Sequence, residues 1–206
     1  MTGMRETHRV TEPDEALARL IEGNARFLRG ESLYAHVSRG IPVDLAAGQW
    51  PFATILGCSD SRVPPEILFD AGFGDLFIIR VAGNIISPEV VGSIQYAGAH
   101  LQTKLFMVLG HESCGAVQAA LAAKFQGARE REHIEALLKN LLPGLEGIDS
   151  NLPPALQLES AVEANVRWSM RQLFALPEAR AHLDEGRVKL VGAIYEIATG
   201  AVRLLA

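Results

Sequence analysis

Short runs of apolar residues alternate with longer amphipathic segments along most of the chain. The apolar runs at 52–57, 76–81, 105–109 and 188–195 are not interrupted by polar residues at every second position. Such runs are typical of strands that are buried on both faces, as in a parallel sheet. Strands that alternate with helices favour an α/β fold, with a mainly parallel four-stranded sheet that is flanked by helices.

The segments between these runs repeat apolar residues every three or four positions, which predicts helices. Residues 11–14 combine a capping hydroxyl, a proline and an acid, so we expect the first helix to begin there and to run to about Leu28. Ser87, Pro88 and Glu89 are a second helix start. Further helices are predicted at 65–69, 88–101, 114–124, 129–142 and 155–174, with a short one after Pro177.

The end of the chain and the gaps between these elements complete the prediction. Thr199 and Gly200 turn the chain into a last short strand, 202–205, which we expect to add an antiparallel edge to the sheet. Residues 31–49 and 143–154 are predicted loops.

The size of the chain favours a single domain, 1–206. It has 206 residues, 49% of them hydrophobic, which is enough to bury one sizeable core. We divide this domain into an N-terminal arm of helix and loop, 1–48, and an α/β core, 49–206. The apolar stripe of the first helix must cover either its own core or a partner subunit.

The charge and the cysteine content exclude several classes of protein. The formal net charge is −5 and no block of Lys or Arg is present, which argues against nucleic acid or an anionic membrane as a partner. No apolar run approaches the roughly 20 residues of a membrane span, and the polar N-terminus lacks the apolar stretch of a signal peptide. Two cysteines are too few for a disulfide scaffold, so we expect free thiols in a reducing compartment and a soluble cytoplasmic protein.

Both cysteines lie just beyond predicted strands. Cys58 follows the strand at 52–57, and Cys114 stands shortly after His111, which follows the strand at 105–109. Ligands of open parallel sheets bind beyond the carboxyl ends of the strands, so these side chains face one crevice if the two strands are neighbours. Two thiolates and one imidazole are a zinc ligand set that leaves a fourth position for water or substrate.

A carboxylate and a guanidinium close to Cys58 add candidate chemistry. Asp60 is near enough to that cysteine to accept a hydrogen bond from a zinc-bound water or to bind the metal itself. Arg62 can hold the Asp60 carboxylate in a fork and keep it off the metal. The motif therefore permits an open, reactive state and a state closed by a fourth protein ligand.

The stretch at 58–62, together with the His-x-x-Cys stretch at 111–114, resembles the β-class carbonic anhydrases. This resemblance implies reversible hydration of carbon dioxide to bicarbonate and a proton. It implies one zinc ion per chain on Cys58, His111 and Cys114, with Asp60 and Arg62 as the catalytic dyad. The likeness extends to four other stretches, at 22–27, 74–77, 80–84 and 192–195.

The resemblance also carries expectations about assembly and substrate. It implies an obligate homodimer, possibly paired into a homotetramer, with the N-terminal helix packed on the neighbouring subunit and the active site at the dimer interface. The residues that it assigns to carbon dioxide or bicarbonate binding are Gln49, Phe77, Tyr96 and Gly115.

Some relatives have a second, inhibitory bicarbonate site that uses a tryptophan three residues before the first zinc cysteine. This chain has Ile55 at that position. We therefore expect no such site here. We also expect that Asp60 does not bind the zinc ion at neutral pH, so that the fourth position of the metal stays open.

Our mechanistic hypothesis is that zinc hydroxide, oriented by Asp60, attacks carbon dioxide that Gln49 orients in a small apolar slot. Since two thiolates keep the zinc electron-rich, activity should rise above neutral pH. One alternative is a hydrolase of carbonyl sulfide or carbon disulfide on the same scaffold. Another is a non-catalytic dimer that is stabilised by zinc and closed by Asp60, although such a site would not need Arg62.

Overall fold

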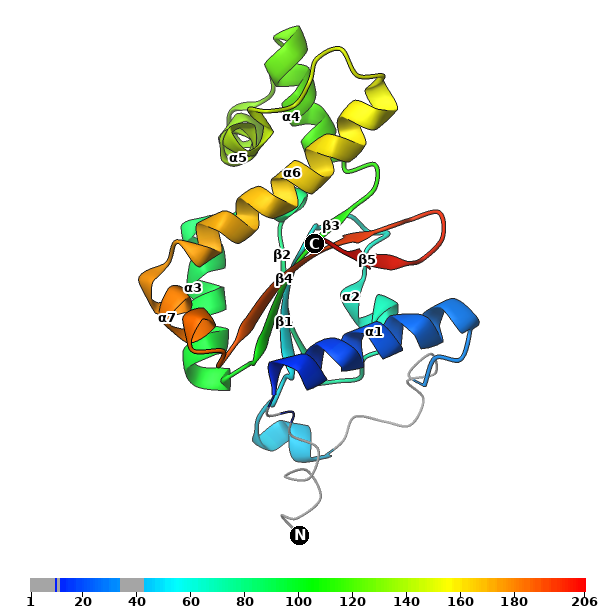
Figure 1. The fold of residues 1–206 in the computed structure, drawn as a ribbon, viewed down its shortest axis with the longest axis vertical. Helices are drawn as coiled ribbons and strands as arrows, with labels where there is room; N and C mark the ends of the chain where they lie inside the picture. Colours follow the sequence, from blue (N-terminus) through cyan, green and yellow to red (C-terminus); the bar gives the residue numbers. More distant parts are fainter. Residues whose placement is uncertain (1–9, 11, 34–42) are drawn as a thin grey trace.

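A five-stranded sheet lies at the centre of the computed structural model, which describes residues 10, 12–33 and 43–206 (Figure 1). The strand order is β2-β1-β3-β4-β5. The first four of these strands run parallel to their neighbours, and β5 pairs antiparallel with β4. The predicted parallel sheet with an antiparallel edge is confirmed. The strands are β1 Ala53–Gly57, β2 Leu76–Arg80, β3 Leu105–His111, β4 Lys189–Tyr195 and β5 Val202–Leu204.

Helices cover both faces of the sheet, with α1 and α2 on one side and the remaining α-helices on the other (Figure 1). Each face buries its own apolar cluster, and every residue of β1 is buried. The α-helices are α1 Pro13–Arg29, α2 Pro65–Leu68, α3 Pro88–Tyr96, α4 Gly115–Gln126, α5 Glu132–Leu141, α6 Pro154–Phe174 and α7 Pro177–Asp184.

Shorter helical turns lie in segments that the sequence pattern described less well. The predicted loop at 31–49 contains a 3-10 helix, Val43–Ala47, and the predicted loop at 143–154 begins with another, Leu142–Leu145. A third, Ala82–Asn84, follows β2. The helix predicted at 88–101 changes to a π-helical turn at Ala97–Leu101.

The predicted helix starts had different outcomes. Ser87 caps α3, because its hydroxyl accepts a hydrogen bond from the Val90 amide at 3.4 Å. Thr11, the expected cap of α1, lies outside the described residues. Glu12 is the N-cap residue of α1 and makes no capping hydrogen bond through its side chain.

Helix α6 packs closely on β3 and β4, because both strands carry a glycine beneath it. A Cβ atom on Gly110 would lie 2.5 Å from Val166, and one on Gly192 would lie 2.5 Å from Met170. A larger residue at either of these two positions would push α6 away from the sheet. The two glycines therefore determine how near the polar side chains of α6 come to the strand ends.

Helix α1 is tied to α2 by equally close packing. A Cβ atom on Gly23 would lie 1.9 Å from the carbonyl oxygen of Phe69. The buried Asn24 amide donates to the carbonyl oxygens of Leu68 and Gly200, both at 3.0 Å. The apolar residue Ile21 on this helix remains 50% exposed. One face of α1 thus packs on its own chain, while its packing on a partner subunit stays a prediction.

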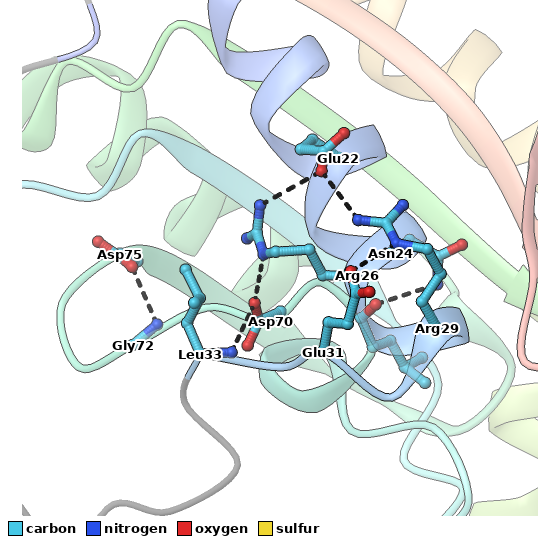
Figure 2. Close-up of polar contacts among 10 residues, drawn as sticks. Glu22, Asn24, Arg26, Arg29, Glu31, Leu33, Asp70, Gly72 and Asp75 are labelled. Atoms are coloured by element: carbon cyan, nitrogen blue, oxygen red, sulfur yellow. Dashed lines mark hydrogen bonds and ion pairs between the residues drawn. The ribbon is translucent and has the colours of Figure 1, made fainter.

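An ion pair fastens the end of α1 beyond this contact. Figure 2 shows Arg26 between Glu22 and Asp70, and its Nε donates to the Asp70 carboxylate at 2.6 Å. The Leu33 amide donates to the same carboxylate oxygen at 3.1 Å. Because the Asp70 side chain is buried, these donors compensate the cost of removing its charge from water.

The described part of the chain contains no helix whose length and apolar character would let it cross a bilayer.

Candidate metal centre

Three side chains converge at the carboxyl edge of the sheet. Cys58 directly follows β1, His111 is the last residue of β3, and Cys114 is the N-cap residue of α4. Because β1 and β3 are parallel neighbours with Gly57 opposite Leu109, Cys58 leaves β1 at the level where β3 passes through Gly110 to His111. The two sulfur atoms and a ring nitrogen of His111 all lie within 4.8 Å of one another. The structure therefore brings together the three residues that the sequence predicted to share one crevice.

Burial and hydrogen bonding show that these residues fit a metal ion. The side chains of Cys58, His111 and Cys114 are all buried. His111 Nδ1 donates to the Glu112 carbonyl oxygen at 2.8 Å, which leaves Nε2 as the ring nitrogen that could bind a metal. Nε2 has no hydrogen-bond partner among the described residues. Two sulfur ligands of a tetrahedral zinc ion lie about 3.8 Å apart, which agrees with ligand atoms that all lie within 4.8 Å of one another here. Such an ion would also give Nε2 a partner.

The closeness of the two thiols shifts their pKa values in opposite directions. A hydrogen bond from Cys114 lowers the pKa of the Cys58 thiol to about 4, and the same bond raises the pKa of Cys114. One sulfur of the pair is therefore readily ionised and the other keeps the proton. A divalent ion would replace that proton, since metal ligands must be deprotonated.

Asp60 and Arg62 form the fork that the sequence suggested. Arg62 donates through Nε to Asp60 Oδ1 at 2.9 Å and through an Nη atom to Oδ2 at 2.8 Å. Asp60 Oδ2 lies 3.9 Å from His111 Nε2, so the carboxylate borders the metal centre. Hydrogen bonding from Arg62 holds the pKa of Asp60 well below its usual range, and the carboxylate stays ionised.

Two residues of this centre were missed by sequence reasoning. Arg80 donates to the carbonyl oxygens of Cys58, at 2.9 Å, and of Asp60. The backbone amide of Gly83 donates to the Cys58 sulfur at 3.3 Å. The available signal was their position, because Arg80 ends a strand that pairs with β1 and Gly83 follows three residues later.

The residues expected to bind substrate do not all lie beside the metal centre. Gly115 does, as the exposed first residue of α4, and a Cβ atom there would meet nothing within 4 Å. Phe77 and Tyr96 instead contact each other, with ring centroids 6.1 Å apart. Phe77 pairs with Thr54 near the start of β1, whereas Cys58 follows its end.

Gln49 lies at the opposite edge of the sheet from Cys58. It is exposed and precedes β1, whose five residues separate the two positions. Five strand residues rise about 16 Å, so the Gln49 amide does not reach the metal centre of its own chain.

The sheet and the Cys–His–Cys group define the class of protein, and comparison with known families agrees. A family profile described as carbonic anhydrase matches residues 53–202. The chain therefore belongs to the β-class carbonic anhydrases, which are lyases.

Individual relatives cover nearly the whole chain. Carbonic anhydrase 2 of Mycobacterium tuberculosis is 40% identical over 192 residues, which are 92% of this chain and 91% of the relative. The tetrameric β-carbonic anhydrases of Sordaria macrospora include a chain with a TM-score of 0.72 and 26% identity, with 94% and 96% of the two chains covered. The Coccomyxa β-carbonic anhydrase in complex with acetazolamide also has a TM-score of 0.72, at 25% identity, covering 92% and 86%.

Proposed function

We propose that this protein catalyses the reversible hydration of carbon dioxide to bicarbonate and a proton, with one zinc ion held by Cys58, His111 and Cys114. The observation that carries the proposal is the convergence of three buried ligand atoms within 4.8 Å, one of them a ring nitrogen without a partner in the described chain. When bound, the ion would supply Lewis acidity that makes water a nucleophile at neutral pH.

Asp60 and Arg62 would orient the reaction. An ionised carboxylate only accepts hydrogen bonds, so Asp60 would accept one from the attacking water and fix the direction of its lone pair. The fork from Arg62 supports this role, because it holds Asp60 in place without filling every acceptor site of the carboxylate. The same fork favours the open state, in which Asp60 is not a metal ligand.

The substrate side would be completed by a second copy of the chain. Gln49, Phe77 and Tyr96 lie away from their own metal centre, so their proposed contacts with carbon dioxide require a homodimer. Exposed apolar side chains, such as Tyr96 at 47% and Trp50 at 45%, support such an interface. The Sordaria relatives are described as tetrameric, which supports a pair of dimers as the larger assembly.

Ile55 supports the expected absence of an inhibitory bicarbonate site. Its side chain is fully buried in the apolar cluster beneath α1, where it offers no donor to an anion. The free, buried thiols of Cys58 and Cys114 fit a reducing compartment, which supports a cytoplasmic location.

The test is to measure metal content and substrate turnover on the same purified sample. We expect one zinc per chain, carbon dioxide hydration in stopped flow, and inhibition by acetazolamide, which the Coccomyxa relative binds. Zinc without hydration would instead favour a structural metal in a non-catalytic dimer. Faster turnover of carbonyl sulfide or carbon disulfide would favour the hydrolase alternative.

A further inference from the structure

The turn Ala82–Asn84, between β2 and α3, delivers a backbone amide to the metal centre. Within it, Gly83 has a φ of 72° and Asn84 a φ of 42°, both in the left-handed region. A Cβ atom on Gly83 would lie 3.1 Å from Ala116 and 3.3 Å from Leu141. Only glycine fits this conformation and this gap, and the result is the Gly83 N–H donating to the Cys58 sulfur at 3.3 Å.

Two polar side chains of α6 hold this turn from the other side. Asn165 Nδ2 donates to the Gly83 carbonyl oxygen at 2.8 Å, and Ser169 Oγ donates to the Asn84 carbonyl oxygen at 3.1 Å. Both side chains are buried. They are four residues apart and therefore share one face of the helix. Helix α6 reaches the turn because of its close approach to the sheet over β3 and β4 (Figure 1).

Apolar packing alone does not explain these polar residues. Asn165 and Ser169 lie among the apolar residues of α6 that cover the sheet, where a buried polar group is costly unless it is hydrogen-bonded. Asn165 Oδ1 and Asn84 Nδ2 have no partner within the described ranges, so part of that cost is not compensated. Such a cost is typical of positions that serve a site.

We propose that Asn165, assisted by Ser169, is a positioning residue of the metal centre and acts on the Cys58 sulfur through the turn. By holding the carbonyl oxygens of Gly83 and Asn84, the two side chains aim the Gly83 N–H at that sulfur. A hydrogen bond to a thiolate withdraws electron density from it and makes it less basic. The inference rests on the proposed zinc site, since the sulfur must be a metal ligand for this bond to affect catalysis.

The test compares three variants of the full-length protein. Asn165→Ala removes the donor to Gly83, and Ser169→Ala removes the donor to Asn84 with a smaller change of volume. The matched control is Thr103→Val. Thr103 is equally buried, and its hydroxyl hydrogen-bonds with Thr54 Oγ1 at 2.9 Å just before β3 begins, at the opposite edge of the sheet from the metal centre.

Each variant is examined for zinc affinity by chelator competition, for the sulfur-to-metal charge-transfer band after cobalt substitution, and for stability in urea. Asn165→Ala should bind zinc about tenfold more weakly, the lower end of the range for residues that support metal ligands, because the turn would no longer hold the Cys58 sulfur in its ligating position and this loss outweighs the gain in basicity. Its cobalt band should move to lower energy, because a thiolate that loses a hydrogen bond is a better electron donor. Ser169→Ala should shift both quantities in the same direction by less.

Thr103→Val should lose stability in urea while its zinc affinity and cobalt band match the wild type. A folded Asn165→Ala variant whose cobalt band and zinc affinity match the wild type would overturn this inference and leave the proposed function standing. The inference would also fail if Thr103→Val shifted the zinc affinity and the cobalt band as far as Asn165→Ala does. If Asn165→Ala does not fold, Ser169→Ala decides by the same two readouts. A wild-type protein that binds neither zinc nor cobalt would overturn the proposed function, and this inference with it.

Discussion

The two edges of the sheet differ in how complete they are within one chain. At the carboxyl edge, Cys58, His111 and Cys114 are buried and hydrogen-bonded, and Arg62 holds Asp60 beside them. At the amino edge, Gln49 is exposed. One chain thus brings the three candidate metal ligands together, whereas Gln49, which is expected to meet the substrate, is left facing outward.

This difference follows from what each edge requires. Metal ligands must converge within a few ångströms, and the parallel neighbours β1 and β3 achieve that because their carboxyl ends point the same way, with Cys58 one residue beyond the Gly57–Leu109 pair and His111 two. In the proposed dimer, a second surface would complete an apolar slot around the exposed ring of Tyr96 and its neighbour Phe77. Variants that affect only one edge should therefore separate metal binding from substrate use.

The largest effect is expected at the metal edge itself. Cys114→Ser replaces a thiolate by a poor zinc ligand, so the purified protein should lack zinc and hydrate carbon dioxide no faster than buffer. Metal analysis and stopped-flow hydration on one sample measure both. The neighbouring exposed Glu112→Gln is the control and should keep both properties. Wild-type turnover by Cys114→Ser would show that this sulfur is not a ligand.

A smaller loss is expected from the residue that borders the metal. Asp60→Asn removes the charged acceptor, and kcat should fall about 100-fold while zinc content stays that of the wild type. Since Arg62 acts by holding Asp60, adding Arg62→Met to Asp60→Asn should lower kcat little further. Losses that simply multiply in the double variant would show that Arg62 acts independently of the carboxylate.

The amino edge can be tested by sharing a site between two chains. Gln49→Ala should keep its zinc and lose about tenfold in kcat/KM, the equivalent of about 1.4 kcal/mol. Co-expressed with Cys114→Ser, its zinc centre would face an intact Gln49 from the partner. The purified mixed dimer should therefore recover wild-type turnover per zinc. Turnover that stays at the Gln49→Ala level would place the glutamine in its own chain's site, or in none.

The smallest effect on turnover is expected from the docking of α1, where a substitution changes stability and not the chemistry. Gly23→Ala forces a methyl group against the Phe69 carbonyl and should lower the free energy of unfolding by about 2 kcal/mol, with zinc content unchanged. Gly92→Ala is the matched control, because it lies in a helix with nothing near its Cβ position. It should raise stability by about 0.5–1 kcal/mol in urea unfolding. Equal effects of the two substitutions would contradict the packing described for α1.

Local pattern predicted most of the architecture. Uninterrupted apolar runs identified β1 to β4, and the Ser87 cap identified the start of α3, because both signals depend on residues close in sequence. The pattern also placed Cys58 and His111 at strand ends. It described the helical turns at Val43–Ala47 and Ala97–Leu101 less well, since these lack a clear apolar period.

By itself, the sequence determined the ligand types, their order along the chain and their position at strand ends, because these follow from the residues and their spacing. The tertiary structure alone showed that Gly83 reaches the Cys58 sulfur, that Arg80 holds the Cys58 and Asp60 carbonyls, and that Asn165 supports the turn. These contacts join segments that are distant in sequence. Their geometry depends on strand order and on how closely helices pack over glycine, which local periodicity does not encode.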